Sequence, residues 1–405
     1  GDTSGAVTIN AGVTTLTGTI AQVQAVYDAT NVTIDADEAV TASDTGTVAA
    51  SDITDLDSET TGVVTVAAGI TTLTGTISQV QAAFDANDDG TVIGLDDTEA
   101  VTLSDTTAAA SSLNTLNAET TGIINAATVT TLTGSLSDVQ TAYTANTNNT
   151  ISGLGNEAVT ASDTGSVVAT DITTLAGDTS GAVTINAGVT TLTGTIAEVQ
   201  AVYDATNVTI DADEAVTASD TGSVAASDIT DLDGETSGLV TLAAGITTLT
   251  GTIAEAQAAF DANDANTVAG LGDDEAVTVS DTSAAAANLN TLNLETVGVI
   301  NAATVLTLTG SLSDVQASYT ANTAGTISGL GNEAVTLSDT GSVTATDITT
   351  LAGDTSGTVT VNAGVATLTG TIAEIQAVYD ASNVAITADE AVTASDTGSV
   401  AASDI

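Results

Sequence analysis

Residues 13–27 read Val13-Thr14-Thr15-Leu16-Thr17-Gly18-Thr19-Ile20-Ala21-Gln22-Val23-Gln24-Ala25-Val26-Tyr27. The first five are rich in Thr and Val, which predicts a β-strand. The following residues predict a helix, because Ile20, Val23 and Tyr27 fall on one helical face. Thr19 and Gln22 have the spacing of a capping box, which places the start of the helix at Thr19. A strand followed by a capped helix is therefore the basic element of the chain.

This element recurs along the whole chain. The register that begins at Gly1 gives seven repeat units, residues 1–57, 58–117, 118–176, 177–233, 234–293, 294–352 and 353–405, and three units make a super-repeat of 176 residues. All seven carry the capping box or a Ser/Asp form of it. We expect one continuous solenoid segment over residues 1–405, in which each repeat contacts only its neighbours. Since both ends fall inside the repeat pattern, we also expect a longer parent chain.

Each unit divides into two similar halves of about 29 residues. In the first unit the second half has strands near residues 32–34 and 38–44, then a helix predicted to carry Val48, Ala49, Ile53 and Leu56. Aligning the halves places residues 41–44 on residues 15–18. Strand, strand, helix is thus one coil. The predicted fold class is α/β: a repetitive solenoid with a parallel β ladder, one short helix per coil and a right-handed winding.

This coil contains a geometric mismatch. Stacked strands lie ~4.8 Å apart, whereas packed helices lie ~8–10 Å apart. We expect curvature or twist to absorb the difference.

All charged side chains of the protein are acidic. The chain has 52 Asp and Glu and no Lys, Arg, His or Cys, yet 42% of its residues are hydrophobic, which predicts a folded core. Inorganic cations are therefore expected partners, and nucleic acid is excluded because it needs a basic patch. No apolar run is long enough for membrane insertion. Because thiol, imidazole and amine groups are absent, we do not expect an enzyme.

Three repeated positions invite a functional interpretation. Every unit repeats Glu-Ala-Val-Thr-x-Ser-Asp-Thr, residues 38–45 in the first, and Asp44 either caps the helix after it or belongs to a repeated cation site.

The strands carry Thr-x-Thr, which stabilises a ladder and is also typical of ice-binding solenoids. All aromatic residues occupy one helical position, which favours the core over a ligand-stacking platform: Tyr27, Phe84, Tyr143, Tyr203, Phe260, Tyr319 and Tyr379.

Residues 85–96, Asp-Ala-Asn-Asp-Asp-Gly-Thr-Val-Ile-Gly-Leu-Asp, resemble the calcium loop of EF-hands and dockerins. The resemblance implies Ca²⁺ as a cofactor, with the following ligands: Asp85, Asn87, Asp89, Thr91 and Asp96. The copy at residues 261–272 has Ala265 at the fifth position and Gly272 at the twelfth, so it is expected to have lost the site. A solvated acidic turn is the alternative interpretation.

Residues 17–25 (Thr-Gly-Thr-Ile-Ala-Gln-Val-Gln-Ala) and 103–106 (Leu-Ser-Asp-Thr) resemble tandem repeats of giant secreted bacterial surface proteins, including those of marine cyanobacteria. The resemblance implies an extracellular, cell-surface location. It also implies a structural role in a surface layer, filament or adhesin stalk, with self-association end to end or laterally. The Gly-Gly-x-Gly-x-Asp nonapeptide of hemolysin-type calcium proteins is absent, so a calcium β-roll is not implied. A calcium-dependent or ice-binding adhesion module is the alternative function.

Overall fold

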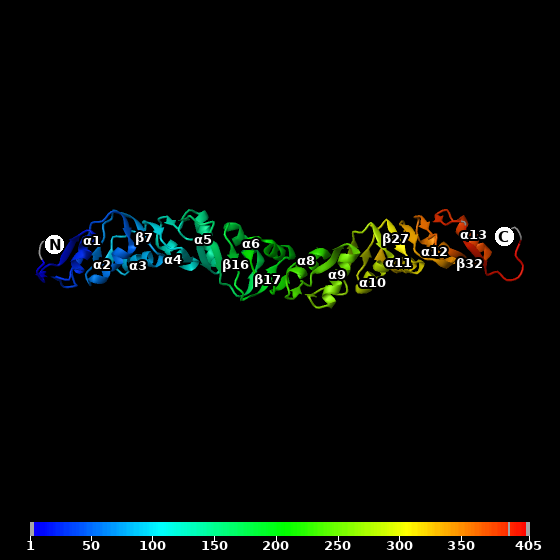
Figure 1. Cartoon of the computed structure of the whole chain (residues 1–405), viewed down its shortest axis with the longest axis horizontal. Coiled ribbons are helices and arrows are strands. Elements are labelled where there is room, and N and C mark those ends of the chain that lie inside the picture. Colours follow the sequence, from blue (N-terminus) through cyan, green and yellow to red (C-terminus); the bar gives the residue numbers. More distant parts are fainter. Residues whose placement is uncertain (1–3, 388, 402–405) are drawn as a thin grey trace. The chain divides into compact units, whose positions relative to one another are not determined.

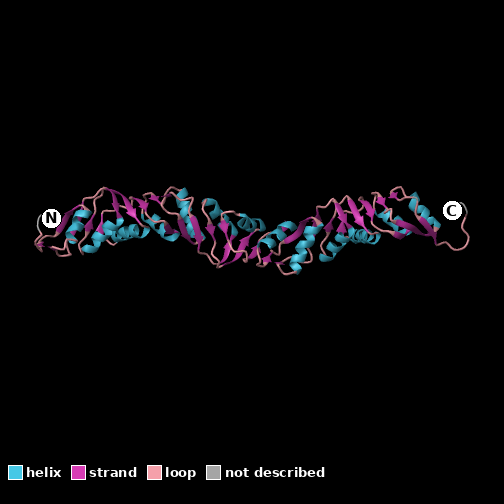
Figure 2. Cartoon of the chain, in the orientation of Figure 1, coloured by secondary structure: helices cyan, strands magenta, loops and turns pink. Residues whose placement is uncertain are grey.

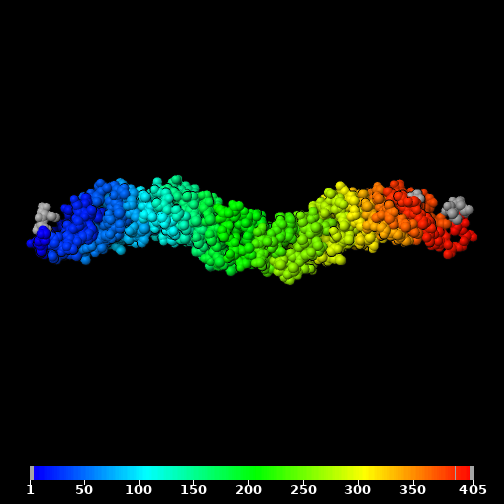
Figure 3. Space-filling view, viewed as in Figure 1, coloured from blue at the N-terminus to red at the C-terminus, as the bar shows by residue number. Residues whose placement is uncertain are grey.

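The computed structural model describes residues 4–387 and 389–401. The parts of the predicted repeats 1–57 and 353–405 that fall on residues 1–3, 388 and 402–405 lie outside the described residues. The chain forms two compact units, residues 1–190 with 201–211 and residues 191–200 with 212–405. Within each unit, coils follow one another in sequence order (Figures 1 and 3).

The helices of the described residues come one to a coil. They are α1 (Ile20–Tyr27), α2 (Ala50–Glu59), α3 (Ile77–Asp88), α4 (Ala110–Glu119), α5 (Leu136–Thr147), α6 (Ala169–Asp178), α7 (Ile196–Asp204), α8 (Ala226–Glu235), α9 (Ile253–Asp264), α10 (Ala286–Glu295), α11 (Leu312–Ala324), α12 (Ala345–Asp354) and α13 (Ile372–Asp380).

The strands of the first unit pair in parallel. β1 (Val7–Thr8) pairs with β3 (Val32–Thr33). A second sheet has the order β2 (Thr15–Gly18), β4 (Ala39–Ala42), β6 (Val64–Thr65), β8 (Val92–Ile93). A third has the order β5 (Gly46–Ala49), β7 (Ile70–Gly75), β9 (Ala100–Leu103), β11 (Ile124–Asn125), β13 (Ile151–Ser152). A fourth has the order β10 (Thr107–Ala109), β12 (Thr131–Gly134), β14 (Ala158–Ala161), β16 (Val183–Thr184), β18 (Val208–Thr209), and β15 spans Gly165–Val168.

The second unit repeats this pairing. One sheet contains β17 (Val189–Gly194), β19 (Ala215–Ala218), β21 (Val240–Thr241) and β23 (Val268–Ala269). The next contains β20 (Gly222–Ala225), β22 (Ile246–Gly251), β24 (Ala276–Val279), β26 (Ile300–Asn301) and β28 (Ile327–Ser328). They are followed by β25 (Ser283–Ala285), β27 (Thr307–Gly310), β29 (Ala334–Leu337), β31 (Val359–Thr360) and β33 (Val384–Ala385), and by β30 (Gly341–Thr344), β32 (Val365–Gly370) and β34 (Ala391–Ala394).

The predicted α/β solenoid with a parallel β ladder is confirmed, with strands and helices alternating along each unit (Figure 2). The predicted helix starts are confirmed as well. The Thr19 hydroxyl accepts from the Gln22 amide at 3.2 Å, and the Gln22 side chain accepts from the Thr19 amide at 3.0 Å. The Ser135 form of the box is incomplete. The Ser135 hydroxyl accepts from the Asp138 amide, but the Asp138 carboxylate accepts from the Ser135 hydroxyl and not from the Ser135 amide.

In the first six repeat units the second half contains a strand that the sequence did not predict. Val48 and Ala49 were predicted on a helix, but they lie on β5, and α2 begins at Ala50. Gly46 takes a left-handed conformation with φ of +75°, which turns the chain before β5. Val48 then pairs with Leu73 of the next coil. The predicted core positions Ile53 and Leu56 are confirmed, because both are fully buried.

The ladder register also differs from the alignment of the two halves. Thr41 pairs with Thr17, two residues from the position that the alignment gave it. A shift of two residues keeps every side chain on the same face of the strand. The two-residue difference therefore leaves the same strand residues facing the core.

Oblique stacking of the strands accommodates the mismatch between strand and helix spacing. The first residues of α1 and α5 are four coils and 116 residues apart, or 29 residues per coil. Four ladder steps lead from Val48 to Ile151, 103 residues away, or about 26 per step. Each coil is therefore displaced by about three residues, ~10 Å along the strand direction. Combined at right angles with the ~4.8 Å between strands, this displacement separates equivalent positions of successive coils by ~11 Å, which leaves room for helices that pack ~8–10 Å apart.

The core lies between the ladder and the helices. The inward row Leu73, Val101, Ile124 and Ile151 is at most 1% exposed, and α2 and α3, which contact β7, bury apolar side chains of their own beside it. Each coil thus buries its apolar face against the coils on either side, as a solenoid requires.

A buried threonine joins the end of each second-half helix to the ladder. The Thr179 hydroxyl donates to the Glu157 carbonyl at 2.7 Å and accepts from the Gly181 amide at 3.0 Å. A Cβ atom on Gly181 would overlap the carbonyl group of Glu157. The same arrangement recurs at Gly62, Gly122, Gly238, Gly298 and Gly357.

Gly181→Ala should therefore destabilise the chain by roughly 1–3 kcal/mol, as overpacking does. Gly177→Ala, four residues earlier in α6, meets no atom within 4 Å and should stabilise it by about 0.5–1 kcal/mol. Urea unfolding monitored by circular dichroism measures both. Equal effects of the two substitutions would contradict the close approach at Gly181.

Candidate functional site

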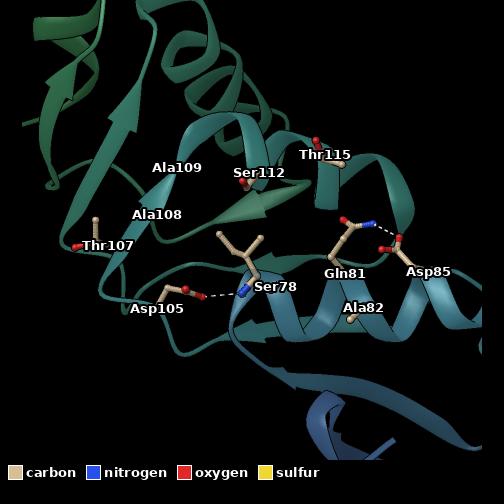
Figure 4. A pocket seen from close by; sticks show the side chains of 11 residues that line it. Ser78, Gln81, Ala82, Asp85, Asp105, Thr107, Ala108, Ala109, Ser112 and Thr115 are labelled. Carbon is tan, nitrogen blue, oxygen red and sulfur yellow. Dashed lines mark hydrogen bonds between the residues drawn. The ribbon is translucent and has the colours of Figure 1, made fainter. Parts of the chain in front are cut away.

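The Asp of the repeated Glu-Ala-Val-Thr-x-Ser-Asp-Thr motif binds the first amide of a helix in the preceding coil. Its Oδ2 atom accepts from this amide at 2.6–2.8 Å in all seven units. The pairs are Asp44 with Ile20, Asp105 with Ile77, Asp163 with Leu136, Asp220 with Ile196, Asp281 with Ile253, Asp339 with Leu312 and Asp396 with Ile372. Figure 4 shows the Asp105 carboxylate in this position.

The predicted capping role of this aspartate is confirmed, but it caps a different helix. Asp44 was expected to cap the helix that follows it, whereas it binds the first amide of α1 in the preceding coil. The helix that follows Asp44 begins after Ala49 without any side-chain cap. The carboxylate instead meets the positive end of the neighbouring helix dipole, so one interaction both caps a helix and joins two coils. A cation at this position stays a prediction.

The predicted calcium ligands are distributed over a helix end and a loop. Asp85 and Asn87 lie inside α3, and Asp89 is its C-cap. Asp85 accepts from Gln81 at 2.9 Å (Figure 4). Asn87 accepts from the Leu95 amide at 3.3 Å. The helix therefore occupies the first third of the segment that resembles a calcium loop.

The remaining ligands also have protein partners. The Thr91 hydroxyl donates to Asp57 at 3.1 Å. Hydrogen bonds from Thr98 hold the pKa of the exposed Asp96 below its usual range. Among residues 4–387 and 389–401, no three acidic side chains converge in an arrangement that could hold a metal ion. Calcium at residues 85–96 stays a prediction.

Shallow grooves lie between a first-half helix and the helix that follows in four repeat units. The groove between α3 and α4 has a volume of about 500 Å³ and is lined by Ser78, Gln81, Asp85, Ser112 and Thr115, among others (Figure 4). Equivalent grooves of about 370, 310 and 270 Å³ lie at α5/α6, α9/α10 and α1/α2. Their walls combine Ile or Leu and, in most of them, Ala with polar and acidic side chains.

A row of buried glutamates is the functional feature that sequence reasoning missed. The first residue of the repeated motif is at most 5% exposed in six units, at Glu38, Glu99, Glu157, Glu214, Glu275 and Glu333. The alternation of side chains along a strand could have predicted this burial. Glu38 lies on the same face as Val40 and Ala42, two and four residues later, and both of these are buried.

In two repeat units the tyrosine at the aromatic position binds this glutamate. The Tyr143 hydroxyl donates to Glu157 Oε2 at 3.2 Å, and the Gly155 amide donates to the same atom at 2.8 Å. Tyr319 and Glu333 repeat the pair at 3.0 Å. Phe84 and Phe260 bring no hydroxyl, and backbone amides alone bind Glu99 and Glu275 there.

The predicted core role of the aromatic row is confirmed in part. Phe84, Tyr143, Phe260 and Tyr319 are buried. Tyr27 and Tyr203 are half-buried, and Tyr379 is 38% exposed. The buried tyrosines, Tyr143 and Tyr319, have a polar role as well, because their hydroxyls donate to glutamate.

Comparisons with protein-family models and with curated proteins found no match for this chain. Within the described part of the chain, no helix has the length and apolar character needed to cross a bilayer. Functional arguments therefore rest on the sequence and the structure.

The buried tyrosines should make stability fall at alkaline pH. Burial raises the pKa of Tyr143 and Tyr319, with a further contribution from the nearby Glu157 and Glu333. A raised folded-state pKa gives stability that is fully present below the unfolded value of about 10 and is lost as pH rises above it. The double variant Tyr143→Phe/Tyr319→Phe should lose less stability than wild type in that range, measured by urea midpoints. Tyr379→Phe, at a position that is 38% exposed, should change the pH slope less than the double variant does. A double variant with the wild-type pH slope would contradict the assignment.

Proposed function

We propose that this chain is a structural repeat region of an extracellular surface layer, filament or adhesin stalk, stabilised by external cations. The observation that carries the proposal is the combination of a regular coil-on-coil solenoid with 52 acidic residues and no basic residue. Such a chain repels itself and needs counter-ions from its surroundings. A saline exterior rich in divalent cations provides them. The resemblance to secreted bacterial surface repeats supports the same location.

The repeated architecture supports a structural role over a catalytic one. The buried glutamate, the helix-capping aspartate and the Thr-Gly junction recur from unit to unit with the same partners. A catalytic site would need one unit that departs from its copies. Solenoids of equivalent coils also associate readily end to end or laterally, which supports self-association as the mode of assembly.

Thermal unfolding across a salt series tests the cation dependence. The melting temperature should rise by several degrees between about 10 mM NaCl with chelator and about 0.5 M NaCl with calcium, because screening shortens from ~30 Å to under ~8 Å and bound ions stabilise further. An unchanged melting temperature would show that external cations do not stabilise the chain. Antibody labelling of intact source cells tests the location, and labelling only after permeabilisation would overturn it.

A calcium-dependent module is the first part of the alternative, and residues 85–96 carry it. Asp85→Ala in the full chain should remove the tightest calcium site detected by calorimetry, because a carboxylate ligand is lost. Asp261→Ala at the same position of the second copy is the matched control and should leave that site intact. Equal effects, or no tight site in wild type, would reject calcium at this segment.

Ice binding is a second candidate function, favoured by the register of the strands. Thr133, Thr160, Thr184 and Thr209 pair in one row across four strands, and the last three are exposed. The row repeats at the strand spacing of ~4.8 Å, giving a regular hydroxyl and methyl surface. Thr184→Tyr should then abolish inhibition of ice recrystallisation, whereas Thr174→Tyr on α6 should not. A wild-type chain without such inhibition would reject this candidate.

A further inference from the structure

The groove between α3 and α4 contains the unpaired edge of a strand. β10 is the end strand of its sheet, and its partner among the described strands is β12. Thr107, Ala108 and Ala109 of β10 line one side of the groove, and α3 lines another (Figure 4). The walls of the three smaller grooves come from helices and one helix cap. The α3/α4 groove therefore combines a volume of about 500 Å³ with a sheet edge.

Two backbone amides of β10 point to this edge. The carbonyls of Thr106 and Ala108 face β12, because donors of β12 bind them at 3.1 and 3.3 Å. The C=O and the N–H of one trans peptide group point in opposite directions. The amides of Thr107 and Ala109 therefore point away from β12, and both residues are exposed. Unpaired N–H and C=O groups along a sheet edge are a template for a further strand.

Small side chains leave the edge accessible. Ser78, Ala82 and Ser112 line the helical walls of the groove. In the second super-repeat Asn288 stands at the position of Ser112. The groove there has about 310 Å³ and is lined by α9 and α10, without β25. A larger side chain at this position thus accompanies the loss of the strand edge from the groove.

The charge of the groove selects the kind of partner. Asp85 and Asp105 line it, and the chain has no Lys or Arg that could pair with them. A second copy of this chain would bring further acids and no cation, so like charges would oppose its binding. A segment of another protein that carries basic residues is electrostatically complementary instead.

We propose that the α3/α4 groove binds an extended segment of a different protein, in which small residues are flanked by Lys or Arg, as an added strand beside β10. Backbone hydrogen bonds to Thr107 and Ala109 hold the segment, and the groove admits small side chains at alternate positions. Basic residues of the segment lie near Asp85 and Asp105. Since β10 has three residues, ~10 Å of the segment pairs with it. This binding site is independent of the proposed cation-stabilised structural role.

Fluorescence anisotropy with a rhodamine-labelled peptide, Lys-Ala-Thr-Ala-Thr-Ala-Lys, tests the site on the full chain. At about 0.15 M NaCl, where surface charges are screened beyond ~8 Å, the wild-type chain should bind one peptide. A second peptide of the same sequence, methylated at its central backbone nitrogens, keeps the charge but cannot pair as a strand. It should bind about tenfold more weakly, as expected for the loss of two hydrogen bonds.

Two variants of α4 locate the bound peptide. Ser112→Asn introduces the residue of the second super-repeat and should weaken binding of the unmethylated peptide to the level of the methylated one. Ser111→Asn makes the same change at the neighbouring exposed position, which does not line the groove, and should bind like wild type.

Three results would overturn the proposal. Equal affinity for the two peptides would assign binding to acids of the surface. Equal affinity of Ser112→Asn and Ser111→Asn would place the peptide outside this groove. A wild-type chain that does not bind the unmethylated peptide would show that the edge of β10 accepts no such strand.

Discussion

The chain contains no basic side chain, so within the protein its carboxylates can be stabilised only by hydrogen-bond donors such as backbone N–H groups and neutral side chains. The aspartate that binds the first amide of the neighbouring coil's helix is the main expression of this constraint. It provides an acceptor for a free helix amide, places an anion at the positive end of the helix dipole and joins two coils. The same solution appears at Glu198, whose carboxylate accepts from the Thr195 amide at 2.7 Å. It appears again at Glu157, which accepts from the Gly155 amide.

The sequence predicted the fold class and the capped helices. These follow from local rules, namely the capping box and the alternation of strand side chains. It did not predict β5, because Val48, Ala49, Ile53 and Leu56 also have spacings that fit a helical face. The decision depends on Gly46 and on the partner strand β7, and the partner is a neighbour only in the folded chain.

The register of the ladder could not be predicted from the sequence for a related reason. Thr-x-Thr repeats every two residues, so a shift of two positions gives the same pattern of threonines and the same buried face. The observed pairing of Thr17 with Thr41 depends on where the helices and turns of both coils hold the strands. At the candidate site, oxygen-bearing residue types alone suggested a loop at 85–96, whereas α3 continues through Asp88. The buried glutamate was overlooked because an acid was assumed to face solvent.

The junction between coils has a mechanical consequence. Two kinds of bond alternate from coil to coil: an aspartate caps each first-half helix, and a buried threonine joins the end of each second-half helix to the ladder. Tension applied along a compact unit would load these bonds in series, and since each kind recurs in every repeat, bonds of one kind would yield at similar forces. Every coil that opens releases about 29 residues, which extend to roughly 100 Å. Such a segment would lengthen severalfold while the force on its attachment points stayed almost constant, and it would shorten again as the coils re-formed.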